Sequence, residues 1–431
     1  MRAALIPLLS TLLSVTLACD DDPSSPTVSV RIVSPSGGDP LSEATFSSVR
    51  VDVLQDGRPL TSVSEALDGE VDIPIEINSL FLETRVRVTL EGSQTWVGAP
   101  PRFVPISSAG LVRIVVGPAG ECAIVEDAEL PSARDQAAAI RVDTFVLSAA
   151  GEEAGGRSRA AEFVDLLRFF SGELPDLTVG GAATGASIGD AKALLITAEG
   201  TLIYDLGEAE MRETPFTRLH AGGDETSTAI ERPNGTTVVG GGTEATWVWD
   251  NERQYTSAVM GMRTRPAGAA FGAEVLVVAG GEPFAELLDP NGEDIVVIEH
   301  EDGERFGALI ARDDDALWLL GGTDGSGASR SDTWSILGCP DACAVVDAPA
   351  WEGAAPTAVL GDLVLAGDSI YRVSFGAGVW QRQLAWTLGA RRDGGLLVEL
   401  ESGVVVVVGG SDAGGARADV EMCWPDELRP L

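Results

Sequence analysis

The sequence predicts an all-β protein, in which a small β-sandwich is followed by a seven-bladed β-propeller. Two observations lead to the propeller. Apolar strands that run into glycines recur seven times between residues 145 and 410, at intervals of 40 to 49 residues. No helical pattern separates the copies, and short strands repeated at such a period are typical of propeller blades. A third observation, strict apolar and polar alternation before residue 120, predicts the sandwich.

The repeat unit is clearest in four copies, whose glycine pairs are 240–241, 280–281, 321–322 and 409–410. The best copy shows four expected strands, at 306–311, 316–320, 332–337 and 342–346. The second strand of each copy is apolar on both faces, as expected where a strand packs between two neighbouring blades. The glycines after it allow positive φ and a close approach of two backbones.

The repeat has an apolar strand, then paired glycines, then an aromatic strand that often ends in Asp. In this order it resembles the kelch repeat, over about residues 122–423. Arg134, Arg263 and Arg305, each ahead of a first strand, also resemble that family. The family's fourth-strand tryptophan is mostly missing, so this is a divergent member. The resemblance implies a propeller similar to the central domain of galactose oxidase. Paired β-sandwiches with glycine-rich hairpins are the alternative, which the even period disfavours.

Residues 1–18 are predicted to be a secretory signal peptide, because their apolar run is too short to span a bilayer. The run ends at Cys19 in a context that resembles a bacterial lipoprotein signal, which implies a lipid on Cys19 and a tether over 19–26. Ordinary cleavage that leaves Cys19 as a free thiol is the alternative. We therefore expect an exported protein anchored by lipid on the periplasmic or cell-surface face of a bacterial envelope, such as the outer membrane. Which leaflet holds the anchor stays open.

The other four cysteines are predicted to form two disulfides, since an exported chain seldom leaves cysteines free. Cys339 ends a third strand and Cys343 begins a fourth, and the repeat places Cys423 and Cys122 in the corresponding positions. We therefore expect strand 122–126 to complete the last blade and Cys122–Cys423 to bridge the seam of the ring, which removes exposed strand edges. A zinc site on the four cysteines is the alternative, and the distance between the pairs in sequence disfavours it.

Two folded domains are expected. Residues 27–119 form an immunoglobulin-like or transthyretin-like sandwich, because alternation as in 49–53 and 85–90 marks strands with one wet face. Its expected role is a stalk or docking module, with a carbohydrate-binding sandwich as the alternative. Residues 120–431 form the propeller.

The formal charge of −37, with Lys192 as the single lysine, excludes several partners. So acidic a chain disfavours nucleic acid and anionic membrane surfaces as ligands. A solvated acidic surface explains the charge, and a face that binds cations or a basic partner is the alternative. Acidic runs at 299–302 and 313–315 lack the spacing of a calcium loop, so no metal site is expected.

The sequence contains no recognisable set of catalytic residues. Kelch-like propellers include galactose-oxidase-like copper enzymes and sialic-acid epimerases. Copper of that kind needs several His and Tyr ligands and a cysteine, whereas this chain has only His220 and His300, three tyrosines and no cysteine left after pairing. No Ser/His/Asp order is present either. We therefore expect no cofactor and no enzymatic activity.

What remains is a binding surface. In kelch-like propellers the loops between second and third strands crowd one face around the central funnel, and Arg157, Arg330 and Arg417 lie on three such loops. Three guanidinium groups there could hold a carboxylate or a sulfated sugar, with solvated arginines that bind nothing as the alternative. The sequence thus predicts a non-catalytic, envelope-anchored binding or scaffold lipoprotein with a protein or glycan ligand. A carbohydrate-active enzyme of the epimerase or hydrolase class is the alternative, which paired carboxylates in the funnel would favour. A spacer without a ligand is a third.

Overall fold

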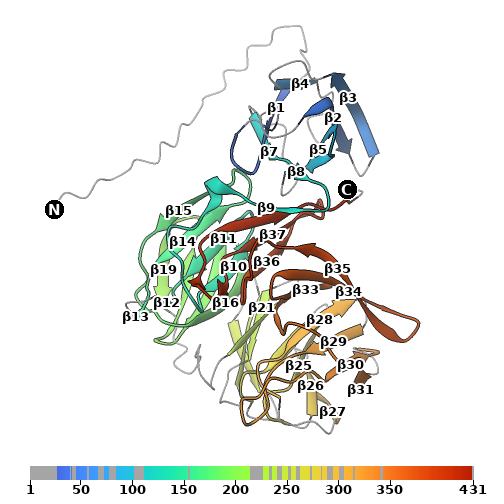
Figure 1. Cartoon of the computed structure of the whole chain (residues 1–431). Helices are drawn as coiled ribbons and strands as arrows, with labels where there is room; N and C mark the ends of the chain where they lie inside the picture. Colours follow the sequence, from blue (N-terminus) through green and yellow to red (C-terminus); the bar gives the residue numbers. More distant parts are fainter. Residues whose placement is uncertain are drawn as a thin grey trace, which may run out of the picture.

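The computed structural model describes residues 27–429, apart from gaps at 39, 41–44, 56–57, 67–71, 77–83, 101–110, 154–155, 214–226, 233–234, 240–244, 251–253, 259–262, 272–273, 283, 289–294, 300–304, 314–315 and 340–342. This part of the chain is all-β, with a short 3-10 helix, η3 (Glu126–Ala128), and no α-helix (Figure 1). Within it, no helix has the length and apolarity needed to cross a membrane. The predicted signal peptide 1–18, Cys19 and the tether 19–26 lie outside the described residues.

The N-terminal part forms two sheets. One has the order β4-β1-β7, and the other has the order β3-β2-β5-β6-β8. Their strands are β1 (Thr27–Val33), β2 (Phe46–Gln55), β3 (Arg58–Ala66), β4 (Asp72–Glu76), β5 (Thr84–Gly92), β6 (Trp96–Gly98), β7 (Leu111–Val115) and β8 (Gly117–Pro118). The alternation predicted from the sequence is visible on β2, where Val49, Val51 and Val53 are buried and Arg50 is exposed. Successive strand residues point to opposite faces, so the valines form one apolar face.

After residue 121, a four-stranded antiparallel sheet recurs seven times within the described residues. The first strands are β10 (Ala138–Val142), β16 (Ala183–Gly189), β20 (Thr228–Arg232), β24 (Ala267–Phe271), β28 (Leu309–Asp313), β32 (Pro356–Leu360) and β36 (Leu396–Glu399). The second strands are β11 (Phe145–Ala149), β17 (Lys192–Thr197), β21 (Gly235–Val239), β25 (Glu274–Val278), β29 (Ala316–Leu320), β33 (Leu363–Ala366) and β37 (Val405–Val408).

The outer half of each sheet completes the pattern. The third strands are β14 (Ala161–Asp165), β18 (Thr201–Asp205), β22 (Ala245–Asp250), β26 (Phe284–Leu288), β30 (Thr333–Leu337), β34 (Ser369–Gly376) and β40 (Val420–Cys423). The fourth strands are β15 (Phe170–Leu174), β19 (Glu210–Glu213), β23 (Gln254–Ala258), β27 (Ile295–Glu299), β31 (Ala344–Ala348), β35 (Val379–Thr387) and β9 (Cys122–Ile124). Two small hairpins, β12–β13 (Glu152–Glu153 and Gly156–Arg157) and β38–β39 (Ser411–Asp412 and Gly415–Ala416), lie between second and third strands.

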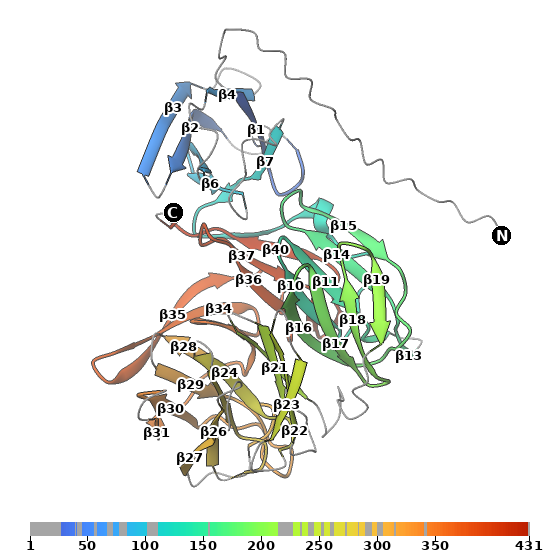
Figure 2. The same ribbon diagram turned by 180° about the vertical axis from the view of Figure 1, so that it is seen from behind.

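The first strands contact one another in a closed ring. Each first strand contacts the first strand of the next sheet, and β36 contacts β10. Figures 1 and 2 show the sheets arranged around this inner ring with their fourth strands outermost. Second strands are buried on both faces between neighbouring sheets, as all five residues of β29 illustrate. This arrangement is consistent with a β-propeller.

The best-predicted repeat differs from the structure in its first strand and in its fourth strand, which was expected at 342–346 and lies at Ala344–Ala348. The expected strand 306–311 begins only at Leu309, whereas the second strand occupies 316–320 as predicted. Phe306 instead forms an isolated bridge with Thr323, in the loop that follows the second strand. The segment before each first strand thus belongs to a loop structure on one face of the ring, and this face carries the candidate site.

The seam of the ring lies where the cysteine pattern predicts it. β9 precedes all the other strands of the ring in sequence, yet it pairs with β40, with Cys122 opposite Cys423. These two cysteines form a disulfide, and Cys339 forms another with Cys343, as predicted. Two disulfides indicate that the protein matures in an oxidising compartment.

The N-terminal sheets pack against this seam. Val33, Val97 and Val115 share one buried cluster with Trp424 and Leu428 from the C-terminal end of the chain. Figures 1 and 2 both show these sheets, in blue, beside the closing sheet, in red and teal.

Candidate functional site

A buried arginine recurs just ahead of the first strand in four sheets, at Arg134, Arg263, Arg305 and Arg392. In three of them, Nη1 donates to the carbonyl of the residue that directly follows the second strand. The distances are 2.5 Å from Arg263 to Ala279, 2.7 Å from Arg305 to Gly321 and 3.2 Å from Arg392 to Gly409. The arginine therefore ties the start of its sheet to the glycine turn.

The glycine two residues after the end of the second strand is needed for this contact. Gly280 has a φ of +81°, and a Cβ added to it would lie 2.9 Å from the Cβ of Arg263. A side chain there would be strained and would collide with the arginine. The two sequence features that resemble kelch repeats, the paired glycines and the preceding arginine, are thus parts of one packing unit.

Each buried arginine has a carboxylate partner. Arg263 lies 2.9 Å from Glu286, and Arg134 lies 3.1 Å from Glu162, with all four side chains almost fully buried. Burial lowers the pKa of Arg263, and the charge of Glu286 opposes that effect. Because both charges of the Arg263–Glu286 and Arg134–Glu162 pairs are buried, we interpret these two arginines as supports of the loops.

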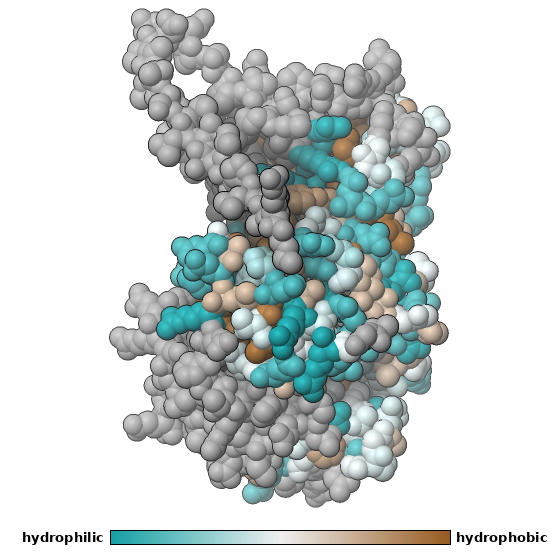
Figure 3. All heavy atoms as spheres, turned by 90° about the vertical axis from the view of Figure 1, so that its left-hand side faces the viewer, coloured by the Kyte–Doolittle hydropathy of each residue, from teal (hydrophilic) through white to brown (hydrophobic). Residues whose placement is uncertain are grey.

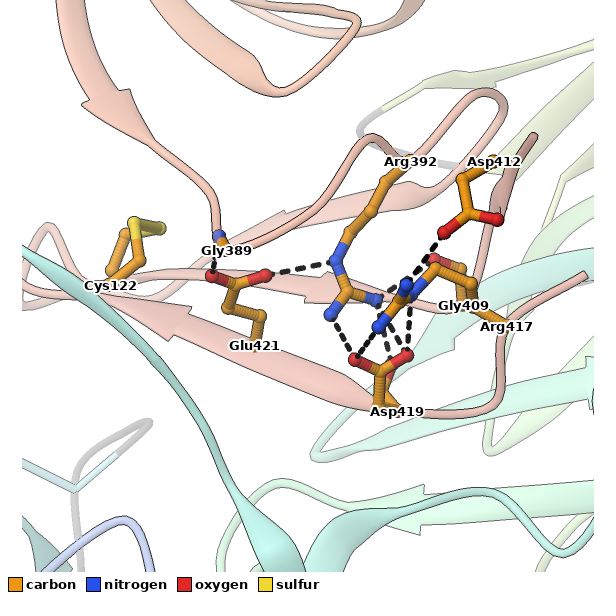
Figure 4. Close-up of polar contacts among 9 residues, drawn as sticks. Cys122, Gly389, Arg392, Gly409, Asp412, Arg417, Asp419 and Glu421 are labelled. Atoms are coloured by element: carbon orange, nitrogen blue, oxygen red, sulfur yellow. Dashed lines mark hydrogen bonds and ion pairs between the residues drawn. A yellow bond between two sulfur atoms is a disulfide. The ribbon is translucent and has the colours of Figure 1, made fainter. Parts of the chain in front are cut away.

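The network around Arg392 extends to the surface (Figure 4). Its Nε donates to Glu421 at 3.0 Å and its Nη2 donates to Asp419 at 2.6 Å. Asp419 also accepts from Arg417, which pairs in addition with Asp412 at 2.7 Å. Burial raises the pKa of Asp419, but the hydrogen bonds and charges of the two arginines outweigh it and hold the pKa below its usual value.

The three arginines predicted to bind a ligand lie on the expected loops, and each is paired with a carboxylate. Arg157 lies 3.4 Å from Glu199, Arg330 lies 2.7 Å from Asp332, and Arg417 is held as described above. Of the three, Arg417 lines a described cavity. Their role in ligand binding stays a prediction, now with the added condition that a ligand must compete with these carboxylates.

The cavity beside Arg417 lies at the seam, between the last and first four-stranded sheets. Its volume is about 170 Å³. This is room for a small polar ligand, because one water needs only about 10–15 Å³ of such volume. The polar side chains around it are those of Ser132, Arg134, Asp135, Gln136, Ser148, Asp393 and Arg417. We call it the seam cavity.

Two carboxylates line the seam cavity from equivalent positions. Asp135 directly follows Arg134, and Asp393 directly follows Arg392. Each forms an isolated bridge with the residue after its own glycine turn, Asp135 with Glu152 and Asp393 with Ser411. The repeat therefore delivers one carboxylate from each of two adjacent sheets to the same cavity.

Asp393 has an unused acceptor. Its Oδ2 accepts a hydrogen bond from Nε of Arg391 at 2.6 Å, whereas its Oδ1 is buried and has no hydrogen-bond partner among the described residues. A buried carboxylate oxygen without a donor is unfavourable, so it favours any ligand that supplies a hydroxyl or amide there. Next to Asp135, Gln136 has a φ of +52°, a strained conformation for a residue other than glycine.

A second cavity, the axial cavity, has a volume of about 410 Å³ and lies inside the ring of first strands. Five consecutive first strands line it with mostly small or apolar residues, namely Thr184, Ala229, Gly268, Ile310 and Val359. Small side chains on the inner strands leave the centre of the ring open.

The described residues on one face of the molecule are mainly polar. Figure 3 shows the described residues of one face as mainly hydrophilic, with isolated hydrophobic spots. On the described part of this face, no continuous apolar patch suggests docking of a partner.

The described residues do not fit a metal centre. Among them, no group of three or more His, Cys, Asp and Glu side chains is placed to hold an ion. Both histidines, His220 and His300, lie outside the described residues, and the four described cysteines are in disulfides. A copper centre with histidine ligands and a free cysteine therefore does not match this part of the chain.

No known protein family and no curated protein sequence matches the chain. Among solved structures, it is similar to a protein described as YjhT, with 11% identity, a TM-score of 0.42, and coverage of 68% of this chain and 95% of that one. It is also similar to a fungal alcohol oxidase of the AA5 family in complex with copper, with 10% identity, a TM-score of 0.45, and coverage of 79% and 89%.

The second of these structures corrects one prediction. We expected a protein without enzymatic activity, because no catalytic constellation is legible in the sequence. One of the two similar structures is an enzyme, so we do not carry that expectation further. Copper chemistry is not carried over either, since the described side chains do not fit it.

Proposed function

We propose that this chain is a carbohydrate-active enzyme of the epimerase or hydrolase class, built on a seven-bladed kelch-like propeller, with the seam cavity as its substrate site. The closed ring of seven first strands supports the count of blades. The observation that carries the function is the pair of carboxylates, Asp135 and Asp393, which line one cavity at the loop face.

The side chains of the seam cavity suit a sugar. Carboxylates accept hydrogen bonds from sugar hydroxyls, and Gln136 can both donate and accept. A hydroxyl that binds Oδ1 of Asp393 would satisfy an acceptor that has no protein donor. Two carboxylates in one cavity can also act as general acid and general base, which is the pairing that carbohydrate chemistry uses.

We infer that the protein acts outside the cytoplasm. The two disulfides support an oxidising location. A lipid on Cys19 would then hold the protein at an envelope membrane. The two N-terminal sheets would form the β-sandwich that joins this anchor to the propeller.

The experiment is a screen of the purified protein for sugar binding on a glycan array and for turnover by NMR. Asp393→Asn and Asp135→Asn remove each carboxylate and keep the side-chain shape. We expect each variant to lose at least about tenfold in affinity or rate, because a hydrogen bond to a charged group is lost. Asp347→Asn is the matched control, since Asp347 is exposed on β31 and does not line the seam cavity.

The proposal fails if no sugar binds or reacts. It also fails if the substitution at Asp347 affects binding and turnover as strongly as the substitutions at Asp135 and Asp393. Binding that depends on both aspartates without turnover would retain the seam cavity as a sugar site and overturn the enzymatic part.

A further inference from the structure

We propose that Arg265 recognises a carboxylate group of a small ligand in the axial cavity. This site is separate from the seam cavity, and it does not depend on the proposed enzymatic activity. Arg265 lies in the loop before β24 and lines the axial cavity. None of the sequence features above singled it out.

Arg265 has unused hydrogen-bonding capacity. Among the described residues, its Nε is buried without a hydrogen-bond partner. Its Nη2 makes a long contact of 3.5 Å with the hydroxyl of Thr323. In the described part of the chain, no carboxylate lies within ion-pair distance of Arg265, in contrast to Arg157, Arg330 and Arg417. A guanidinium in this state can bind a carboxylate with two parallel hydrogen bonds.

The surroundings of Arg265 favour an ion pair with a ligand. Gly307 lies beside the guanidinium, and a Cβ added to it would be 3.9 Å from Nη1, so this side of the group stays uncrowded. Other walls of the cavity are Ala229, Gly268 and Ala308, which carry no competing charge. Apolar walls weaken the screening by water and strengthen the attraction of an anion.

The backbone holds Arg265 in a strained conformation. Its φ is +48°, in the left-handed region that few residues other than glycine adopt, and its carbonyl accepts a hydrogen bond of 2.9 Å from Gly307. A glycine would take this φ without strain, so the presence of an arginine requires another reason. We assign that reason to the guanidinium and its place in the wall of the axial cavity.

The test is isothermal titration calorimetry on the purified full-length chain with three probes. Propionate carries the carboxylate alone, D-glucuronate carries it on a sugar, and D-glucose is the neutral counterpart of glucuronate. We expect propionate and glucuronate to bind, and Arg265→Gly to weaken both at least about tenfold, because the charge-assisted hydrogen bonds are lost. Arg265→Gly is expected to fold normally, since glycine relieves the positive φ.

Arg168→Ala is the control. The side chain of Arg168 is 72% exposed, lies 3.9 Å from Asp165 and does not line the axial cavity. We expect it to bind propionate as the wild type does. The proposal is overturned if neither acid binds, or if Arg265→Gly binds them unchanged at an unchanged melting temperature.

The two proposals fail independently. Asp393→Asn should leave propionate binding intact, because Asp393 lines the seam cavity and not the axial one. Propionate binding that requires Arg265 supports the axial site even if no sugar reacts at the seam. Propionate binding that requires Asp393 and not Arg265 would overturn it.

Discussion

At the scale of single residues, Tyr204 on β18 is fully buried and its hydroxyl has no hydrogen-bond partner in the described structure. Burial raises the pKa of this phenol from 10.0 to about 12. Because the folded state disfavours the phenolate, this group contributes stability that is fully present below pH 10. That contribution is lost as the pH rises through 10 toward 12.

We therefore predict that the free energy of unfolding of the wild type declines more steeply above pH 10 than that of Tyr204→Phe. Near pH 7 the variant should be within about 1 kcal/mol of the wild type or more stable, because the lost hydroxyl makes no hydrogen bond. Urea unfolding from pH 7 to pH 11 measures both. If the free energies of unfolding of the wild type and of Tyr204→Phe changed with pH in parallel, the raised pKa of Tyr204 would be contradicted.

The arginines of the funnel-face loops show what a residue-level pattern can and cannot reveal. Arg330 and Asp332 are two positions apart, as are Arg417 and Asp419, and in extended backbone such residues lie on the same side of the chain. Their pairing was therefore open to prediction. The lack of a described carboxylate beside Arg265 could not be predicted, because it depends on which side chains lie near it in the folded ring.

At the scale of elements, the recurring unit is a β-sheet whose glycine turn is held by a buried arginine and its carboxylate. The Arg263–Glu286 pair in the sheet of β24 to β27 has both side chains at 0% exposure. Removing one member leaves a buried charge without a partner, which typically lowers the free energy of unfolding by about 3–5 kcal/mol.

We predict that Glu286→Gln lowers the free energy of unfolding, measured by chemical denaturation, by about 3–5 kcal/mol. The matched control is Glu352→Gln, because Glu352 pairs with Arg382 at 3.7 Å with 86% of its side chain exposed. An exposed pair contributes less than about 1 kcal/mol. Equal effects of the two substitutions would show that the buried pair does not hold the turn.

The seam aspartates also belong to this scale, because the element places them. An Arg-Asp dipeptide occurs at 134–135 and again at 392–393, both times just before a first strand. The first and last four-stranded sheets are neighbours in the ring. With that knowledge, the repeated dipeptide indicates that two aspartates line one cavity. The glycine and strand pattern alone did not draw attention to it.

At the scale of the whole molecule, the ring is closed by a strand and a disulfide that join residues 301 positions apart. Constraining so long a loop in the unfolded chain contributes about 5–6 kcal/mol in the chain-entropy model. The Cys339–Cys343 bridge spans only 4 positions, for which the same model gives about 2 kcal/mol.

We therefore predict that Cys122→Ala combined with Cys423→Ala lowers the free energy of unfolding more than Cys339→Ala combined with Cys343→Ala. Urea unfolding under oxidising conditions compares the two double variants. A larger loss for the Cys339–Cys343 variant would argue against the seam as the main constraint on the ring.

The β class, the repeat and the cysteine pairs could be predicted from the sequence, because the period, the apolar runs and the cysteine positions within the repeat can be recognised without the tertiary structure. Seven copies predicted seven sheets, and the match of Cys122 to Cys343 and Cys423 to Cys339 predicted the strand that closes the ring.

The availability of Asp393 and Arg265 for a ligand could not be predicted without the tertiary structure. Arg157, Arg330 and Arg417 are neutralised by nearby carboxylates, whereas Asp393 keeps a buried acceptor and Arg265 keeps its donors. Availability depends on which side chains meet once the sheets close into a ring. For Asp393 and Arg265, the surrounding residues come from different sheets, so their availability is a property of the folded ring and not of the repeat.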